Sequence, residues 1–117
     1  MARVGVDPSS EEFRAAIRVL EHPWTGTLLA LLQGGAKRFG ELAAGAGGVA
    51  DKILSARLKE LEAQGLVSRV VDTGPPLRGL YALTPRADGF GLVAEAIARW
   101  GQELLGAGGT LPRGRRQ

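Results

Sequence analysis

The sequence has no cysteine, one histidine and no long hydrophobic run, and each absence narrows what the chain can do. Without cysteine, these 117 residues form no disulfide, thiolate nucleophile, thiol redox sensor or cysteine-ligated metal site. His22 is the only histidine, which excludes an ordinary histidine-rich metal site. We therefore expect neither a metal nor another cofactor.

The longest stretch without a charge, residues 23–36, has 14 residues, fewer than the roughly 18 that a membrane-spanning helix needs. Residues 1–7 have no apolar signal core. We expect a cytoplasmic protein that does not contact membranes. No serine or threonine has a plausible base, and no glycine-rich segment matches a phosphate-binding loop, so we expect no enzyme.

The composition predicts one globular domain, because 44% of the residues are hydrophobic and 23% are charged. We expect an N-terminal arm at residues 1–8, the domain at residues 9–106, and a basic, disordered tail at residues 107–117. The net charge of +3 is uneven: residues 36–80 hold seven bases against five acids, and the tail holds three arginines and no acid. This distribution favours a polyanionic partner.

The first half of the chain predicts three helices. The first begins at Ser9-Ser10, where a serine cap is paired with a glutamate three residues later, and ends before Pro23. The second begins near Trp24 and stops at Gly34-Gly35; it is apolar on most of its surface, so we expect it to be central. The third, residues 38–46, ends in a glycine-rich turn.

The fourth predicted helix, Ala50–Gln64, has two different faces. Three leucines at i, i+4 and i+7 form its apolar stripe: Leu54, Leu58 and Leu61. Small or basic residues lie about 100 to 200 degrees away from Leu54: Lys52, Ser55, Ala56 and Lys59. Arg57 lies at the edge of the core, where we expect it to pair with Glu41.

The last third of the chain predicts a hairpin and a closing helix. Two strands, residues 66–71 and 80–83, flank a turn at residues 72–78. Thr84 can cap the last helix with Pro85 at its first position. Four apolar residues give this helix a stripe: Val93, Ile97, Trp100 and Leu104.

This order of elements is typical of a winged helix-turn-helix, a mainly α fold with a small β-hairpin wing. A helix with small or cationic outer residues fits the major groove, so we expect residues 50–64 to be the recognition helix. Four of its residues would read or approach DNA: Lys52, Ser55, Ala56 and Lys59. Arg38 would help position the DNA backbone, and Arg78 would extend from the wing, residues 72–80.

Each of these contacts has a plainer interpretation. Taken alone, lysines on the outer face of a helix, such as Lys52 and Lys59, are usually just solvated surface charge. Ser55 could be a tolerated small residue, and Arg38 an ordinary surface residue. The basic tail could attract DNA or only keep the chain soluble.

Seven blocks of sequence resemble the HxlR-type family of bacterial winged-helix transcriptional regulators, which is MarR-like. Their order and spacing cover about residues 13–105. The blocks are Pro23-Trp24-Thr25, Lys37-Arg38-Phe39-Gly40-Glu41-Leu42, Lys52-Ile53-Leu54-Ser55-Ala56-Arg57-Leu58, Glu60-Leu61-Glu62-Ala63-Gln64-Gly65-Leu66-Val67-Ser68-Arg69, Pro75-Pro76, Tyr81-Ala82-Leu83-Thr84-Pro85 and Ala98-Arg99-Trp100-Gly101.

The resemblance implies a homodimer on a double-stranded DNA operator with two half-sites, which represses or activates nearby genes. It also implies a two-fold contact between the first and last helices. We expect apolar residues of both helices in that contact: Phe13, Ile17, Val93, Ile97, Trp100 and Leu104.

The chain departs from the family pattern in three ways. Many relatives carry a cysteine as a redox sensor, so thiol signalling does not carry over to this chain. The wing reads Leu77-Arg78 after its two prolines, where the family commonly has an arginine and later an acid. Gly89 and Gly91 lie where the last helix should begin, so we expect that helix to start late or to bend.

Two other functions stay open. A winged helix can dock a partner protein instead of DNA, which would make the chain an interaction adaptor. The chain could also sense an unknown small-molecule effector, because the dimer helices could enclose an apolar pocket near Trp24, Phe90 and Trp100.

Overall fold

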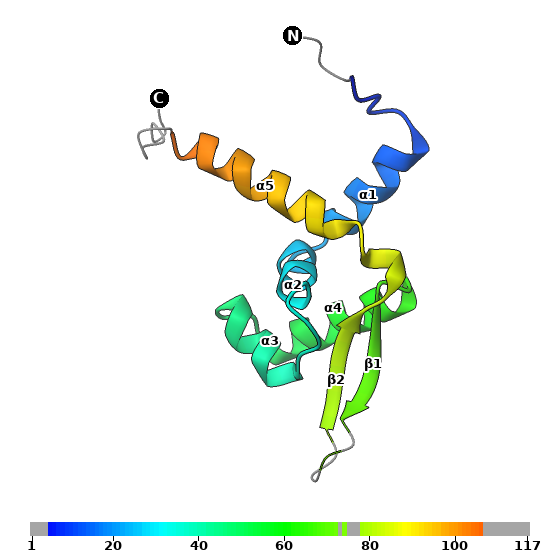
Figure 1. Ribbon diagram of the computed structural model, residues 1–117, viewed down its shortest axis with the longest axis vertical. Helices are drawn as coiled ribbons and strands as arrows, with labels where there is room; N and C mark the ends of the chain where they lie inside the picture. Colours follow the sequence, from blue (N-terminus) through cyan, green and yellow to red (C-terminus); the bar gives the residue numbers. More distant parts are fainter. Residues whose placement is uncertain (1–4, 73, 75–77, 107–117) are drawn as a thin grey trace.

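A computed structural model describes residues 5–72, 74 and 78–106 (Figure 1). The first four residues of the expected arm and the whole expected tail lie outside these residues, so the predicted domain bounds stay predictions. The described chain is mostly helical with one antiparallel hairpin, as predicted. Its elements are α1 (Glu11–Glu21), α2 (Thr25–Leu32), α3 (Phe39–Ala46), α4 (Asp51–Ala63), β1 (Val67–Asp72), β2 (Arg78–Leu83), the short 3-10 helix η1 (Pro85–Ala87) and α5 (Phe90–Leu104).

Helix α2 forms the centre of the core, as its apolar sequence predicts. Its buried leucines pack with those of α3 and α4: Leu28, Leu29, Leu32, Leu42, Leu54, Leu58 and Leu61. Fully burying one such side chain stabilises the fold by about 1.5–3 kcal/mol. Figure 1 shows α2 between α5 on one side and the α3–α4 pair on the other.

The start of α1 differs in detail from the prediction. Ser10 is the cap, and its hydroxyl accepts a hydrogen bond from the Phe13 N–H at 3.2 Å. Ser9 turns the other way and donates its N–H and hydroxyl to Asp7 Oδ1. These bonds favour the charged carboxylate, so they lower the pKa of Asp7. The predicted cap with a glutamate is wrong, because the residue three positions after Ser10 is Phe13.

A tight turn joins α1 to α2. The Thr25 N–H donates to the His22 carbonyl at 3.3 Å, and Trp24 has φ 72° and ψ −10°. With Pro23 at the second position, this is the geometry of a type II turn, whose third position normally holds glycine. Trp24 packs against the core in this left-handed conformation, which costs an L-residue about 1–2 kcal/mol. The direction of α1 therefore depends on a strained residue.

The hairpin pairs β1 with β2 from Val67 opposite Leu83 to Asp72 opposite Arg78. One further β-bridge, between Lys37 and Tyr81, was not predicted. The Lys37 N–H donates to the Tyr81 carbonyl at 2.9 Å, and the Tyr81 N–H donates back at 2.8 Å. This bridge holds the segment before α3 against the base of the wing.

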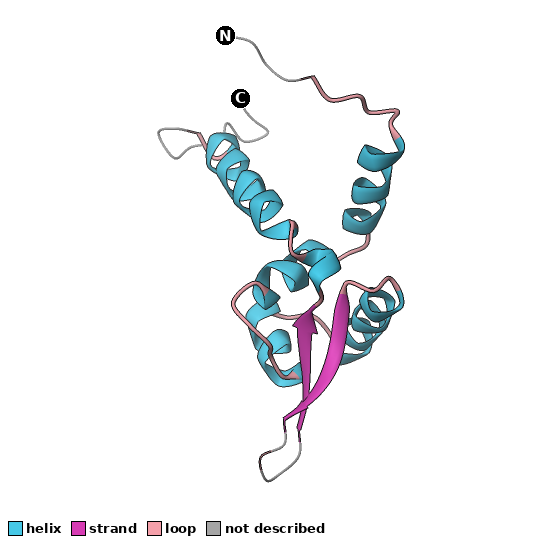
Figure 2. Ribbon diagram, turned by 45° about the vertical axis from the view of Figure 1, so that its right-hand side comes forward, coloured by secondary structure: helices cyan, strands magenta, loops and turns pink. Residues whose placement is uncertain are grey.

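Thr84 and Pro85 do not open the last helix. Pro85 begins η1, and α5 starts only at Phe90 after Gly89, so the late start expected from the glycines is confirmed. The Thr84 hydroxyl donates instead to the Gly65 carbonyl at 2.5 Å. Figure 2 shows α5 and α1 leaving the body as two diverging arms.

Candidate nucleic-acid interface

Helices α3 and α4 form the helix-turn-helix. Helix α3 ends at Gly47 with φ 73°, and Gly48 follows with φ 120°, values that favour glycine because it has no Cβ. Val49 then turns into the core and is buried. Two glycines and one apolar anchor thus set the angle at which α4 leaves α3.

Helix α4 separates its two faces as predicted. Its leucine stripe, residues 54, 58 and 61, is at most 1% exposed. On the opposite face Lys52, Ala56 and Lys59 are exposed and Ser55 is half-buried. The outer face of α4 is therefore a surface of cationic and small residues, and the opposite face of the helix is buried in the core.

Arg57 does not pair with Glu41, so that prediction is wrong. Glu41 accepts a hydrogen bond from the Arg38 N–H at 2.8 Å and helps to cap α3. Arg57 Nη1 donates to Glu60 Oε1 at 2.5 Å and lies 3.2 Å from His22 Nδ1. We call His22, Arg57 and Glu60 the Arg57 cluster.

Arg57 has an unusual environment for a surface-helix arginine. Its side chain is 19% exposed, and its Nε is buried with no hydrogen-bond partner among the described residues. An unpaired buried polar group costs about 1–3 kcal/mol. The contacts at Nη1 must offset this cost.

Other cations lie near the start of α3 and on the wing. Arg38 is exposed at the cap of α3. Arg78 begins β2, but its side chain and the wing tip lie outside the described residues. Arg69 on β1 was not predicted as a site residue; it is exposed, and its guanidinium carbon lies 5.4 Å from the centre of the Tyr81 ring. The strand register could have indicated it, since Arg69 lies directly opposite Tyr81.

The six predicted dimer residues lie on the two arms and are open to solvent. They are between 37 and 60% exposed: Phe13, Ile17, Val93, Ile97, Trp100 and Leu104. A groove of about 820 Å³ runs between α1 and the start of α5, lined by Val19, Leu20, Phe90, Val93 and other residues. These arms therefore carry a large apolar surface that the described chain leaves uncovered.

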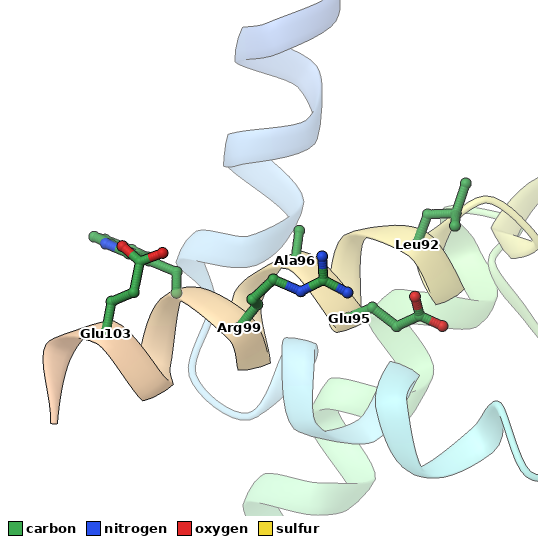
Figure 3. A pocket seen from close by; sticks show the side chains of 6 residues that line it. Leu92, Glu95, Ala96, Arg99 and Glu103 are labelled. Atoms are coloured by element: carbon green, nitrogen blue, oxygen red, sulfur yellow. The ribbon is translucent and has the colours of Figure 1, made fainter. Parts of the chain in front are cut away.

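Within one chain, Phe90 and Trp100 lie in separate hollows, and the expected pocket between the helices of a dimer stays a prediction. Trp100 lines a shallow hollow on α5 alone, where Glu95, Arg99 and Glu103 stand side by side along the helix (Figure 3). Phe90 lines the groove against α1 instead, and Trp24 lines neither. Phe90 and Trp100 thus belong to different hollows.

Within the described residues, no three histidine, aspartate or glutamate side chains gather where they could hold a metal ion. None of their helices has the length and apolar character needed to cross a membrane.

Comparison with known proteins identifies the family. Residues 19–108, most of the chain, match the HxlR-like helix-turn-helix family. The chain belongs to the HxlR-like helix-turn-helix family. The resemblance inferred from its sequence blocks is confirmed, and HxlR membership supports DNA-binding transcription regulation.

Three similar proteins illustrate the family. YvaP of Bacillus subtilis (strain 168), an uncharacterised HTH-type transcriptional regulator, is 33% identical over 93 residues, covering 80% of this chain and 86% of YvaP. The reduced form of the redox regulator HypR has a TM-score of 0.74 at 26% identity, covering 83% of this chain and 96% of HypR. A MarR-family regulator of Enterococcus faecalis V583 has a TM-score of 0.71 at 27% identity, covering 88% and 94%.

Proposed function

We propose that this chain is a homodimeric transcriptional regulator that binds a DNA operator with two half-sites. Helix α4 enters the major groove, and the wing, residues 72–80, lies on the flanking groove or backbone. One observation carries the proposal: the outer face of α4 is exposed, small and cationic, while its other face is buried against the core.

The side chains on this face suit different tasks. Lys52 and Lys59 can reach base edges or phosphates. Ser55 and Ala56 are small, so they let the helix backbone approach the base pairs. Arg38 offers a cation at the start of α3, where it would contact a phosphate.

The wing is the second part of the proposed interface. Arg78 would extend to the flanking backbone or minor groove. We add Arg69, because its guanidinium lies over the Tyr81 ring and remains exposed. A guanidinium held over an aromatic ring has fewer conformations to lose on binding phosphate.

The homodimer is proposed from the arms. Six apolar side chains on α1 and α5 are exposed, and a second copy would cover them through a two-fold contact. HypR is named a redox regulator, but this sequence has no cysteine. Thiol oxidation of this chain is therefore not the signal that controls it.

A gel shift with the DNA that flanks the chain's own gene tests the proposal. A dimer with roughly 6–10 phosphate contacts should lose some 10³–10⁵ in affinity between 50 and 200 mM salt. Lys52→Ala or Lys59→Ala should each weaken binding by roughly 1–3 kcal/mol if the lysine reaches a base edge, and should mainly flatten the salt dependence if it reaches only phosphate.

Arg14→Ala is the matched control. Arg14 is an exposed cation on α1, which is not part of the proposed DNA interface, and it is not one of the six proposed dimer residues. It should leave binding unchanged. Unchanged affinity in both lysine variants would remove α4 from the interface. The absence of any complex at low salt would favour the adaptor function instead.

A further inference from the structure

The Arg57 cluster connects two parts of the chain that have different tasks in the proposed function. His22 is the C-cap of α1, a proposed dimer helix, whereas Arg57 and Glu60 belong to α4, the proposed recognition helix. Arg57 Nη1 lies 3.2 Å from His22 Nδ1 and 2.5 Å from Glu60 Oε1, and Glu60 Oε1 is 3.9 Å from His22 Nδ1. Within the described residues, no other side-chain hydrogen bond joins the end of α1 to α4.

Helix α1 has few other anchors. None of its residues is buried, and only Val19 and Leu20 are half-buried. Figure 2 shows α1 standing away from the body. Its connection to α2 is the short turn whose Trp24 has a positive φ. The angle of such an arm depends on side contacts near its base, where His22 lies.

The geometry of Arg57 suits the task of holding an angle. An arginine only donates hydrogen bonds, so His22 Nδ1 must be the acceptor. The guanidinium is planar, and its donors point in fixed directions. Because Nε has no partner among the described residues, the contacts at Nη1 determine the orientation of the group.

We propose that Arg57 is a positioning residue which, with His22 and Glu60, fixes the angle between α1 and α4. In the dimer this angle sets the separation and rotation of the two recognition helices, and so the spacing of half-sites that the protein accepts. The claim about half-site spacing rests on the proposed function. The claim that the cluster fixes the angle between α1 and α4 within one chain does not.

The angle can be measured with spin labels, because the absence of cysteine leaves only introduced labelling sites. Arg14→Cys on α1 and Ala63→Cys on α4 place nitroxides at two exposed positions. Dilution with unlabelled protein restricts the measured distances to one chain. Arg57→Met keeps the stem but removes the guanidinium, and it should broaden the distance distribution about twofold because α1 then samples several angles.

Variants of His22 keep this test independent of whether Arg57→Met folds. His22 is about half exposed, so His22→Leu should preserve the fold and broaden the distribution in the same way. His22→Asn places an acceptor near the position of Nδ1 and should restore the narrow distribution. A distribution in Arg57→Met or His22→Leu as narrow as in the parent protein would overturn the proposal.

The consequence for DNA is tested with duplexes that the unmodified protein selects from a random pool. Changing the half-site separation by one base pair rotates one half-site by about 34 degrees, so the parent protein should bind the altered duplex more weakly. Arg57→Met should lose about tenfold of this discrimination while its affinity for a single half-site stays unchanged. A variant that is only less stable would bind the selected duplex and the altered duplex more weakly by the same factor, so its discrimination between the two spacings would stay intact.

Arg14→Gln is the control, and it should discriminate between spacings as the parent protein does. If the parent, Arg57→Met and His22→Leu discriminated equally between the spacings, the claim that the Arg57 cluster sets the half-site spacing would be overturned. The proposed function would still stand. If the parent selects no duplex, the proposed function and the claim about half-site spacing both fail, and the label distances still decide whether the cluster fixes the angle.

Discussion

At the scale of single residues, Trp24 shows how packing overrides local preference. A left-handed residue is normally glycine, since a Cβ crowds the backbone there. Trp24 has φ 72° and still packs against the core. The structure keeps tryptophan at this position because its side chain covers the leucines beneath it, which offsets the cost in the backbone.

The backbone cost at Trp24 can be isolated by comparing two variants. Trp24→Gly and Trp24→Ala both remove the side chain, but only glycine accepts the positive φ without strain. We expect Trp24→Gly to be more stable than Trp24→Ala by about 1 kcal/mol, measured by urea unfolding. The opposite order, with alanine the more stable, would show that the turn is not strained.

Which side chains pair with one another was harder to predict than which face of a helix a residue lies on. The burial of Leu54 and Leu58 follows directly from their spacing. The Arg57–Glu60 pair could have been predicted, because the two residues are three apart on one helix. The contact of Arg57 with His22 could not, because it depends on where that distant residue lies in the fold. Glu41 could have been assigned from sequence, since it lies three residues after the cap residue Arg38 and accepts from its N–H.

At the scale of elements, α1 and α5 behave differently from the three central helices. Helices α2, α3 and α4 each bury at least one leucine, whereas no residue of α1 or α5 is buried. Both arms nevertheless carry apolar stripes at helical spacing. Stripes that the described residues leave uncovered are the basis of the proposed contact between two copies of the chain.

This interface can be disrupted at the middle of α5. Ile97 is 47% exposed, so Ile97→Glu should leave the helices intact while it places a charge in the proposed dimer contact. We expect a monomer by analytical ultracentrifugation, with unchanged helical circular dichroism. Glu95→Gln, a change on a different face of α5, is the control and should remain dimeric. A dimeric Ile97→Glu variant would place the contact elsewhere.

Element boundaries were predictable where capping chemistry is local. Pro23 and the glycines after α3 ended their helices as expected. The start of α5 was harder to predict from the sequence, because Thr84 and Pro85 are residues that commonly begin a helix. Here the Thr84 hydroxyl donates to the Gly65 carbonyl, a contact between residues 19 positions apart that the local sequence does not indicate.

At the scale of the whole molecule, the fold separates three tasks. The leucine core around α2 holds the body together, the arms carry the exposed apolar side chains of the proposed dimer contact, and the outer face of α4 is open to solvent. The basic excess of residues 36–80 lies in the helix-turn-helix and wing, away from the arms. This separation suits a dimer that places two cationic helices on one duplex.

Protection of the selected duplex from dimethyl sulfate tests the central claim most directly. The reagent methylates guanine N7 in the major groove and adenine N3 in the minor groove, so it reports which groove is occupied. We predict two protected blocks of guanines about one helical turn apart, with protection reduced in the Lys52→Gln, Lys59→Gln double variant. A stable complex whose guanines all remain reactive would contradict the account, because α4 would then lie outside the major groove.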